Sequence, residues 1–337
     1  MSSGAYSSFK PAWHTGHIET LRAGGVPIPK HVHLVISDLC NQDCHFCAYR
    51  ISSGFTSEQF GVIENGVLNR NPNRMIPTQK VKEILEDGAS AGVKAFQFTG
   101  GGEPTVHPDH IELLRYALDL GLECSLVTNG YLLRDGWDEV FPRLSWLRVS
   151  VDADDAAVYS RVRNVSLNAY SRTMKNIRAI SDRLRATGSE CLFGAGYVVT
   201  RENWKAMPEG VEALREAGVG YVRLTAMFSR EFDSYYEGLD SRIRNSIEVS
   251  RGLETDTFKV IDLYGTRISD MSQQSPDYDM CGYQHFTTYI GANQKVYRCC
   301  TTSYTQHGEI GDLSNQRFSN WLSSSERQDK LLTFNSR

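Results

Sequence analysis

Short apolar runs alternate with longer amphipathic segments over the first two thirds of the chain. Six runs rich in β-branched and aromatic residues predict strands, and the segments between them repeat apolar residues at helical spacing. The predicted strands are His33–Ser37, Ala95–Thr99, Glu123–Thr128, Trp146–Asp152, Cys191–Thr200 and Tyr221–Met227, and the predicted helices include Thr78–Ala91, Asp109–Leu120, Tyr170–Ala186 and Asn203–Ala217. Strands that alternate with helices indicate a parallel sheet covered by helices. Because a closed TIM-like barrel needs eight such repeats, six predict an α/β fold with an open, partial (β/α)6 barrel.

The alternation of side chains within a strand indicates which residues line this barrel. In the sixth predicted strand every second residue is apolar and should pack under the helices, which turns Arg223 and Met227 inward. By the same rule the fourth strand turns Arg148, Ser150 and Asp152 inward. A buried Arg or Asp without partners costs free energy. These polar groups are therefore expected to meet a ligand or water, or to satisfy one another in an ion-pair network.

The rest of the chain divides into smaller parts. Ser52–Ile76 is rich in Asn, Gly, Ser and Pro and predicts a loop or short helix beside the strand ends. Glu231–Thr257 has a polar, helical pattern, whereas the last part predicts two short strands and a helix that contains Trp321. We therefore expect an N-terminal segment (1–30), the barrel (31–235), a helical linker (236–275) and a small C-terminal extension of a β-hairpin plus a helix (276–337).

Composition narrows the class of protein. The chain has 337 residues, more than the roughly 250 of a typical barrel domain, which leaves room for the extension. Lys and Arg number 36 against 40 for Asp and Glu, so the net charge of −4 argues against a broad nucleic-acid-binding surface. Long apolar stretches are absent, and Met1–Lys10 lacks the apolar core of a signal peptide, so no membrane association is expected. Most of the eight cysteines gather at 40–47 and 281–300, which indicates metal ligands in a reducing cytoplasm.

Three cysteines in one short loop carry the most specific chemistry. Cys40, Cys44 and Cys47 follow the first apolar run with the spacing C-x3-C-x2-C. A structural zinc site closes its tetrahedron with four protein ligands, and four-cysteine iron–sulfur clusters use one thiolate per corner. Three thiolates therefore leave one metal corner open to a small molecule. The spacing alone also allows zinc or an unrelated thiol cluster.

The segment Cys40–Arg50 resembles the signature loop of the radical S-adenosylmethionine (radical SAM) superfamily. The resemblance implies that Cys40, Cys44 and Cys47 hold a [4Fe–4S] cluster, whose fourth iron is chelated by the amino and carboxylate groups of SAM. It also places Phe46, the aromatic residue before the third cysteine, near the adenine of SAM.

Three further motifs at predicted strand ends carry the same resemblance. Thr99–Pro104 contains a Gly-Gly-Glu sequence, Val127–Gly130 contains Thr-Asn-Gly, and Val149–Asp152 contains Ser-x-Asp. By resemblance, the methionine amino group of SAM is contacted by Gly101, Gly102 and Glu103, and its carboxylate or ribose by Asn129, Ser150 and Asp152. Catalytic groups of β/α barrels gather at the C-terminal ends of the strands, so all four motifs are expected at one edge of the sheet.

A second group of cysteines lies in the extension. Cys281, Cys299 and Cys300 accompany the predicted hairpin in an order that resembles SPASM and twitch extensions, which carry auxiliary iron–sulfur clusters in many radical SAM enzymes. No cysteine follows Cys300, so at most one auxiliary cluster is possible, with a His, an Asp or the substrate as fourth ligand. A zinc ion or a bare cysteine pair is the alternative. Cys124 and Cys191 lie within strand patterns and are expected to be buried core residues.

Taken together, these resemblances imply a radical SAM enzyme. An electron donor such as flavodoxin or ferredoxin would drive reductive cleavage of SAM, and the resulting 5′-deoxyadenosyl radical would abstract hydrogen from a carbon of a peptide or small metabolite. The predicted substrate contacts are Tyr197, Arg223 and Met227. An alternative within the family is an isomerase or modifier of a nucleobase or nucleotide in DNA hypermodification. A non-catalytic iron–sulfur or zinc protein is the alternative of another class, and it would have no use for the SAM-binding motifs.

Overall fold

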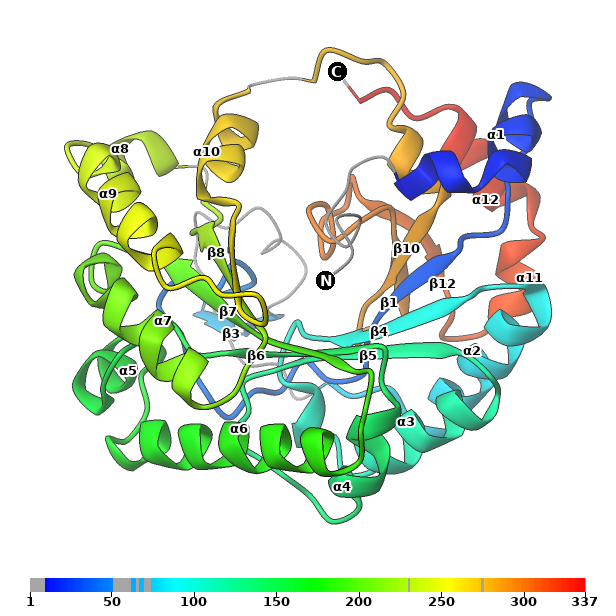
Figure 1. Ribbon diagram of the computed structural model, residues 1–337. Helices are drawn as coiled ribbons and strands as arrows, with labels where there is room; N and C mark the ends of the chain where they lie inside the picture. Colours follow the sequence, from blue (N-terminus) through cyan, green and yellow to red (C-terminus); the bar gives the residue numbers. More distant parts are fainter. Residues whose placement is uncertain are drawn as a thin grey trace.

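The computed structural model describes residues 10–50, 62–64, 67–69, 74–229, 231–273 and 276–336. A ten-stranded sheet with the strand order β12-β11-β10-β1-β4-β5-β6-β7-β8-β9 curves into an open, partial barrel with helices around its outside (Figure 1). Its strands are β1 (His31–Val35), β4 (Ala95–Thr99), β5 (Glu123–Thr128), β6 (Trp146–Ser150), β7 (Leu192–Val199), β8 (Tyr221–Ala226), β9 (Lys259–Asp262), β10 (Thr287–Ile290), β11 (Lys295–Tyr297) and β12 (Glu309–Asp312). A separate hairpin pairs β2 (Val62–Glu64) with β3 (Val67–Asn69); most of the loop predicted at 52–76 lies outside the described residues.

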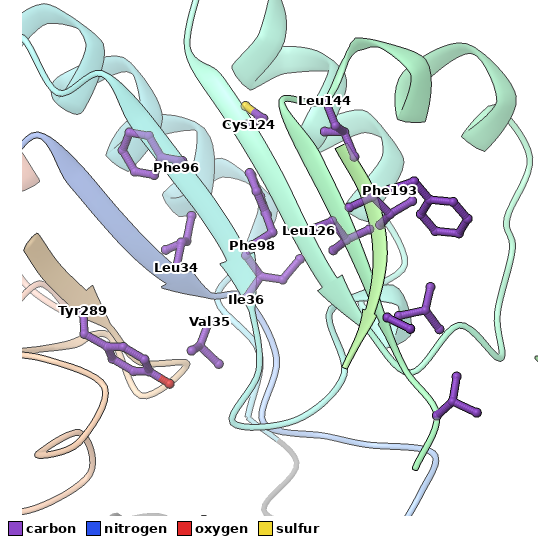
Figure 2. Packing of buried hydrophobic residues seen from close by; sticks show 14 of the residues in the cluster. Leu34, Val35, Ile36, Phe96, Phe98, Cys124, Leu126, Leu144, Phe193 and Tyr289 are labelled. Carbon is purple, nitrogen blue, oxygen red and sulfur yellow. The ribbon is translucent and has the colours of Figure 1, made fainter. Parts of the chain in front are cut away.

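Helices surround the sheet, and most of them bury apolar side chains. They are α1 (Thr15–Arg22), α2 (Thr78–Ala91), α3 (His110–Asp119), α4 (Trp137–Val140), α5 (Ala156–Arg163), α6 (Asn168–Ala186), α7 (Met207–Glu216), α8 (Phe232–Tyr236), α9 (Asp240–Arg251), α10 (Tyr264–Ser272), α11 (Phe318–Leu322) and α12 (Ser325–Leu332). Leu34, Phe96 and Leu126 are fully buried members of this core (Figure 2). No helix in the described ranges is both long enough and apolar enough to cross a lipid bilayer.

The structure confirms the predicted α/β partial barrel. All six predicted barrel strands are present and pair in parallel along the sheet. Four of the observed strands were not predicted. β2 and β3 lie in the segment expected to be a loop or short helix, and β12 adds a third strand to the predicted hairpin. The fourth, β9, lies within the segment expected to be a helical linker and pairs in parallel with β8. Its four residues include only two apolar ones, too few for a recognisable strand pattern.

The C-terminal extension continues the barrel sheet. The predicted hairpin is formed by β10 and β11, and the predicted helix is α11. β10 lies beside β1 (Figure 1). The two strands pair in parallel, with Thr287 opposite His31. The indole N–H of Trp321 donates to the carbonyl oxygen of Ile310 at 3.1 Å, and the ring is fully buried. The extension is therefore attached to the strand from which the cysteine loop leaves.

His110 makes the stability of this fold depend on pH. It is 1% exposed at the start of α3, and burial, assisted by the charges of Arg134 and His107, lowers the pKa of His110 to about 4. The unfolded chain takes up this proton near pH 6.5, so acid favours unfolding as the pH falls from about 6.5 towards 4. We expect His110 to lower the free energy of unfolding by about 2 kcal/mol at pH 5 relative to pH 8.

Urea unfolding of the His110→Gln variant across this pH range measures that contribution. The variant is expected to lose about 2 kcal/mol of the pH dependence, whatever its stability at pH 8. An unchanged pH dependence would show that folding does not lower the pKa of His110.

Candidate functional site

The cysteine loop and the Gly-Gly-Glu turn form one packed unit at the C-terminal ends of β1 and β4. The backbone N–H of Gly102 donates to the carbonyl oxygen of Ser37 at 3.0 Å, and that of Glu103 donates to the carbonyl oxygen of Leu39 at 2.9 Å. A Cβ atom at Gly102 would lie only 2.3 Å from the Leu39 oxygen. Glycine is therefore required for this close approach of two backbones.

Glu103 and Asn129 lie beside the cysteine loop, as predicted. The buried carboxylate of Glu103 accepts from the hydroxyl of Thr128 at 2.6 Å and from the backbone N–H of Asn129 at 2.7 Å, which ties the end of β4 to the end of β5. The side-chain amide of Asn129 donates to Asn41 in the loop at 2.7 Å. Burial, together with the charge of Glu103, raises the pKa of Cys40 to about 11. A carboxylate thus faces the region of the first thiol.

The three thiols of the loop are free and half-buried. The backbone N–H of Cys47 donates to the carbonyl oxygen of Cys44 at 3.1 Å, which closes a turn that carries two of the thiols. Burial raises the pKa of Cys44 to about 12, and the neighbouring Cys47 and Cys40 add to that shift. Within the part of the chain that the structure describes, no three His, Cys, Asp or Glu side chains converge as they would around a bound metal ion. The donors nevertheless fit an iron–sulfur cluster in kind and number, because soft thiolates are the ligands that such clusters use.

A buried arginine supports the loop from behind. Arg163, at the end of α5, is 3% exposed, and its carbonyl oxygen accepts from the backbone N–H of Asp43 at 3.1 Å. Its guanidinium Nη1 donates to Gln42 Oε1 at 2.6 Å and lies 3.9 Å from Cys44 Sγ. Sequence reasoning missed Arg163 because residues far apart in the chain make these contacts and no local pattern marks them.

Arg50 was missed as well. It follows the third cysteine by three residues, is 5% exposed, and donates from Nη1 to the carbonyl oxygen of Gln42 at 2.8 Å. Burial raises the pKa of Cys47, and the charge of Arg50 opposes that shift. Two buried positive charges therefore border a loop that would become strongly negative as thiolates.

The Ser-x-Asp motif has two different environments. Ser150 is half-buried, and its register with Gly196 places it on the inner face of the sheet, as predicted. Asp152 has a left-handed backbone, with φ of 63°, and is fully buried. Its carboxylate accepts from Arg163 and, at 2.6 Å, from the backbone N–H of Val198. The predicted contact between Asp152 and SAM finds no support, whereas the alternative of an internal ion pair does.

The predicted substrate contacts divide in the same way. Arg223 pairs in register with Gly196 and shares the inner face with Ser150. Tyr197 pairs with the helix-facing Leu224, is fully buried, and donates from its hydroxyl to the carbonyl oxygen of Asn203 at 3.0 Å. The prediction of Tyr197 as a substrate contact is therefore wrong. β7 has glycines at two inward positions, so its sequence does not alternate between inward and outward side chains. The sequence therefore does not show which way Tyr197 points.

Other predicted site residues are placed but not assigned a role. Gly101 is buried next to Gly102, Phe46 is 9% exposed beside the cysteines, and Met227 is 5% exposed just beyond β8. Their contacts with SAM or substrate stay predictions.

A tyrosine connects the surroundings of the two cysteine groups. Tyr49 follows the cysteine loop, and its hydroxyl lies 2.9 Å from that of Tyr289 in β10. Burial raises the pKa of Tyr49, and the charges of both Cys300 and Cys47 add to the shift, so a thiol of each group lies near this tyrosine. Cys124 is buried, as expected, whereas Cys191 is only half-buried.

The fold and the site define a partial β/α barrel with three thiols at the C-terminal edge of its sheet. A model of the Radical SAM superfamily matches residues 34–205, about half of the chain. The chain belongs to the radical SAM superfamily. Membership brings the cofactors of the family, a [4Fe–4S] cluster and SAM, as the sequence predicted.

Named relatives share the barrel region. An AdoMet-dependent heme synthase from Methanosarcina barkeri is 28% identical over 152 residues, which are 44% of this chain and 40% of that protein. A PqqA peptide cyclase from Gluconobacter oxydans is 32% identical over 142 residues, 42% of this chain and 38% of the relative. The alignments thus span less than half the length of these two relatives.

Solved structures share the fold over most of this chain. Streptococcus suis SuiB bound to the precursor peptide SuiA has a TM-score of 0.63 and 15% identity, with 93% of this chain and 69% of that chain covered. The structure of anSMEcpe with bound AdoMet has a TM-score of 0.60 and 13% identity, with 90% of this chain and 82% of that chain covered. At these identities the likeness concerns the fold, and it agrees with the predicted SPASM/twitch-type architecture.

Proposed function

We propose that this protein is a radical SAM enzyme in which Cys40, Cys44 and Cys47 hold the [4Fe–4S] cluster. The observation that carries the proposal is the packing of the three-thiol loop against the Gly-Gly-Glu turn, which requires a residue without a side chain at position 102. When bound, the cluster supplies the electron that cleaves SAM into methionine and a 5′-deoxyadenosyl radical, which takes a hydrogen atom from a substrate carbon.

The chain's own residues would bind and orient SAM at this edge of the sheet. In this proposal the turn at Gly101 and Gly102 meets the methionine part of SAM. The Glu103 carboxylate, which Thr105, Thr128 and Asn129 hold in place, supplies negative charge for the ammonium group of SAM. Asn129 and Ser150 offer polar groups from the ends of β5 and β6, and Phe46 offers an apolar surface for adenine.

Anaerobic reconstitution with iron and sulfide, followed by dithionite and SAM, tests the proposal directly. We expect the protein to bind iron at the N-terminal loop and to form methionine and 5′-deoxyadenosine. Zinc at this loop with four protein ligands, or iron-loaded protein that leaves SAM intact, would exclude the proposed function.

The inner face of the sheet favours a substrate with a carboxylate or phosphate group. Arg148 and Arg223 both point into the barrel by register, and a Cβ atom on Gly196 would lie 3.6 Å from Arg148 Cδ, so the Arg148 side chain runs across β7. We propose a peptide or a small metabolite as substrate. The two arginines also keep the nucleotide alternative open, because phosphate pairs well with guanidinium groups.

We also propose an auxiliary iron–sulfur cluster at Cys281, Cys299 and Cys300. Simultaneous replacement of Cys299 and Cys300 by alanine is expected to remove about half of the bound iron, since each [4Fe–4S] cluster holds the same number of irons. Iron analysis and Mössbauer spectra measure the loss, and the single variant Cys191→Ala is the control. Equal iron content in both proteins would mean that these cysteines hold no cluster.

Reduction of the N-terminal cluster requires an external electron. We propose a low-potential donor such as flavodoxin or ferredoxin, and a cytoplasmic location. All eight cysteines are free in the structure, the state that a reducing compartment maintains.

A further inference from the structure

A buried ion pair lies directly behind Cys44. The side chains of Arg163 and Asp152 are 3% and 1% exposed and pair through Nη2 and Oδ2. Arg163 Nη1 is held by Gln42 Oε1 at 2.6 Å and lies 3.9 Å from Cys44 Sγ. The other Asp152 oxygen is held by the backbone N–H of Val198. Both members of the pair are thus fixed in place, with the positive member next to the sulfur.

We propose that this ion pair sets the reduction potential of the cluster bound through Cys44. The inference rests on the proposed function, because it requires a cluster on that thiolate. Arg163 carries a full positive charge, because an arginine guanidinium is not deprotonated in proteins. Charges and hydrogen-bond donors close to cluster sulfurs are what proteins use to tune iron–sulfur potentials.

The direction of the effect follows from the charges. One-electron reduction makes a thiolate-bound cluster more negative, so a nearby positive charge stabilises the reduced state and raises the potential. Asp152 partly cancels Arg163 and therefore lowers the potential. The low polarity of a buried site strengthens both interactions. Arg163 and Asp152 are positioning residues with opposite expected effects on one measured quantity.

Three single variants of the full chain test this assignment. Arg163→Gln removes the positive charge, and Asp152→Asn removes the negative charge at nearly constant shape. Arg161→Gln is the matched control, because it removes the same charge from α5 two residues before Arg163. The Arg161 side chain is 53% exposed and pairs with Glu202 at 3.4 Å. After anaerobic reconstitution, an EPR-monitored titration gives the midpoint potential of the cluster whose signal changes when SAM is added. Iron content and thermal unfolding are measured on the same samples.

We expect a lower potential in Arg163→Gln, a higher potential in Asp152→Asn and no change in Arg161→Gln. A role in folding alone would reduce iron content without moving the two potentials in opposite directions. Unchanged potentials, or shifts of the same sign, in iron-loaded variants overturn the inference. If Arg163→Gln does not retain iron, Asp152→Asn decides by itself, and a potential that fails to rise overturns the inference. Absence of a SAM-responsive cluster in the unmodified protein would instead overturn the proposed function.

Discussion

The Cys44→Ala variant is expected to lose both the N-terminal cluster and SAM cleavage. Cys44 is the middle thiol of the loop, and Arg163 lies 3.9 Å from its sulfur. Two remaining thiolates cannot hold a cube that needs three protein ligands and an open corner. We expect 5′-deoxyadenosine formation to fall by more than about 100-fold, beyond what loss of a group that merely supports a ligand costs.

Cys191→Ala provides the matched control for this experiment. Cys191 undergoes the same chemical change, is also half-buried, and lies just before β7. This variant should retain iron and SAM cleavage. Cleavage at the unmodified rate by Cys44→Ala would remove the basis of the functional assignment.

The Gly102→Ala variant, which adds a single methyl group, is expected to lose both stability and SAM cleavage, the second largest effect that we predict. The Cβ atom of Gly102→Ala would lie 2.3 Å from the carbonyl oxygen of Leu39 and 2.4 Å from the carbonyl carbon of Asp38. Both atoms are backbone, so the cysteine loop and the Gly-Gly-Glu turn must move apart. Such overpacking costs about 1–3 kcal/mol of stability, and a displacement of about 1 Å lowers catalysis on the order of 100-fold.

Gly16→Ala separates this steric effect from the general effect of replacing glycine. Gly16 lies in α1, and a Cβ atom there would meet nothing within 4 Å. Chemical denaturation and a SAM-cleavage assay on both variants give the comparison. If Gly102→Ala retained unmodified stability and cleavage, the two segments would not need the close contact described above.

The barrel could be predicted because apolar residues repeat with different periods in its strands and its helices, and because the helices are longer. Thr78–Ala91 was predicted with the bounds of α2, and the runs at β4 and β5 coincide with the observed strands. β9 could not be predicted, because a four-residue edge strand contributes too few side chains to show alternation. The parallel pairing of β10 with β1 depends on long-range contacts that local patterns do not encode.

The candidate site was predicted where a motif has fixed spacing along the chain. The cysteine loop, Glu103 and Asn129 come together as expected. Arg163 could not be found in this way, because its contact with Cys44 joins positions on a helix and a loop with no motif in common. Tyr197 was assigned to the wrong face because β7 carries glycine where an inward side chain would have marked the alternation.

The pairing of β10 with β1 also bears on how the protein is made. During synthesis, His31 leaves the ribosome more than 250 residues before its partner Thr287. At about 5–20 residues per second, that interval lasts on the order of 10–50 s. During that time one edge of β1, next to the nascent cysteine loop, has no partner strand. Unpaired strand edges promote aggregation. Because β10 is synthesised so long after β1, we expect the protein to mature slowly. We also expect it to benefit from chaperones that shield strand edges during translation.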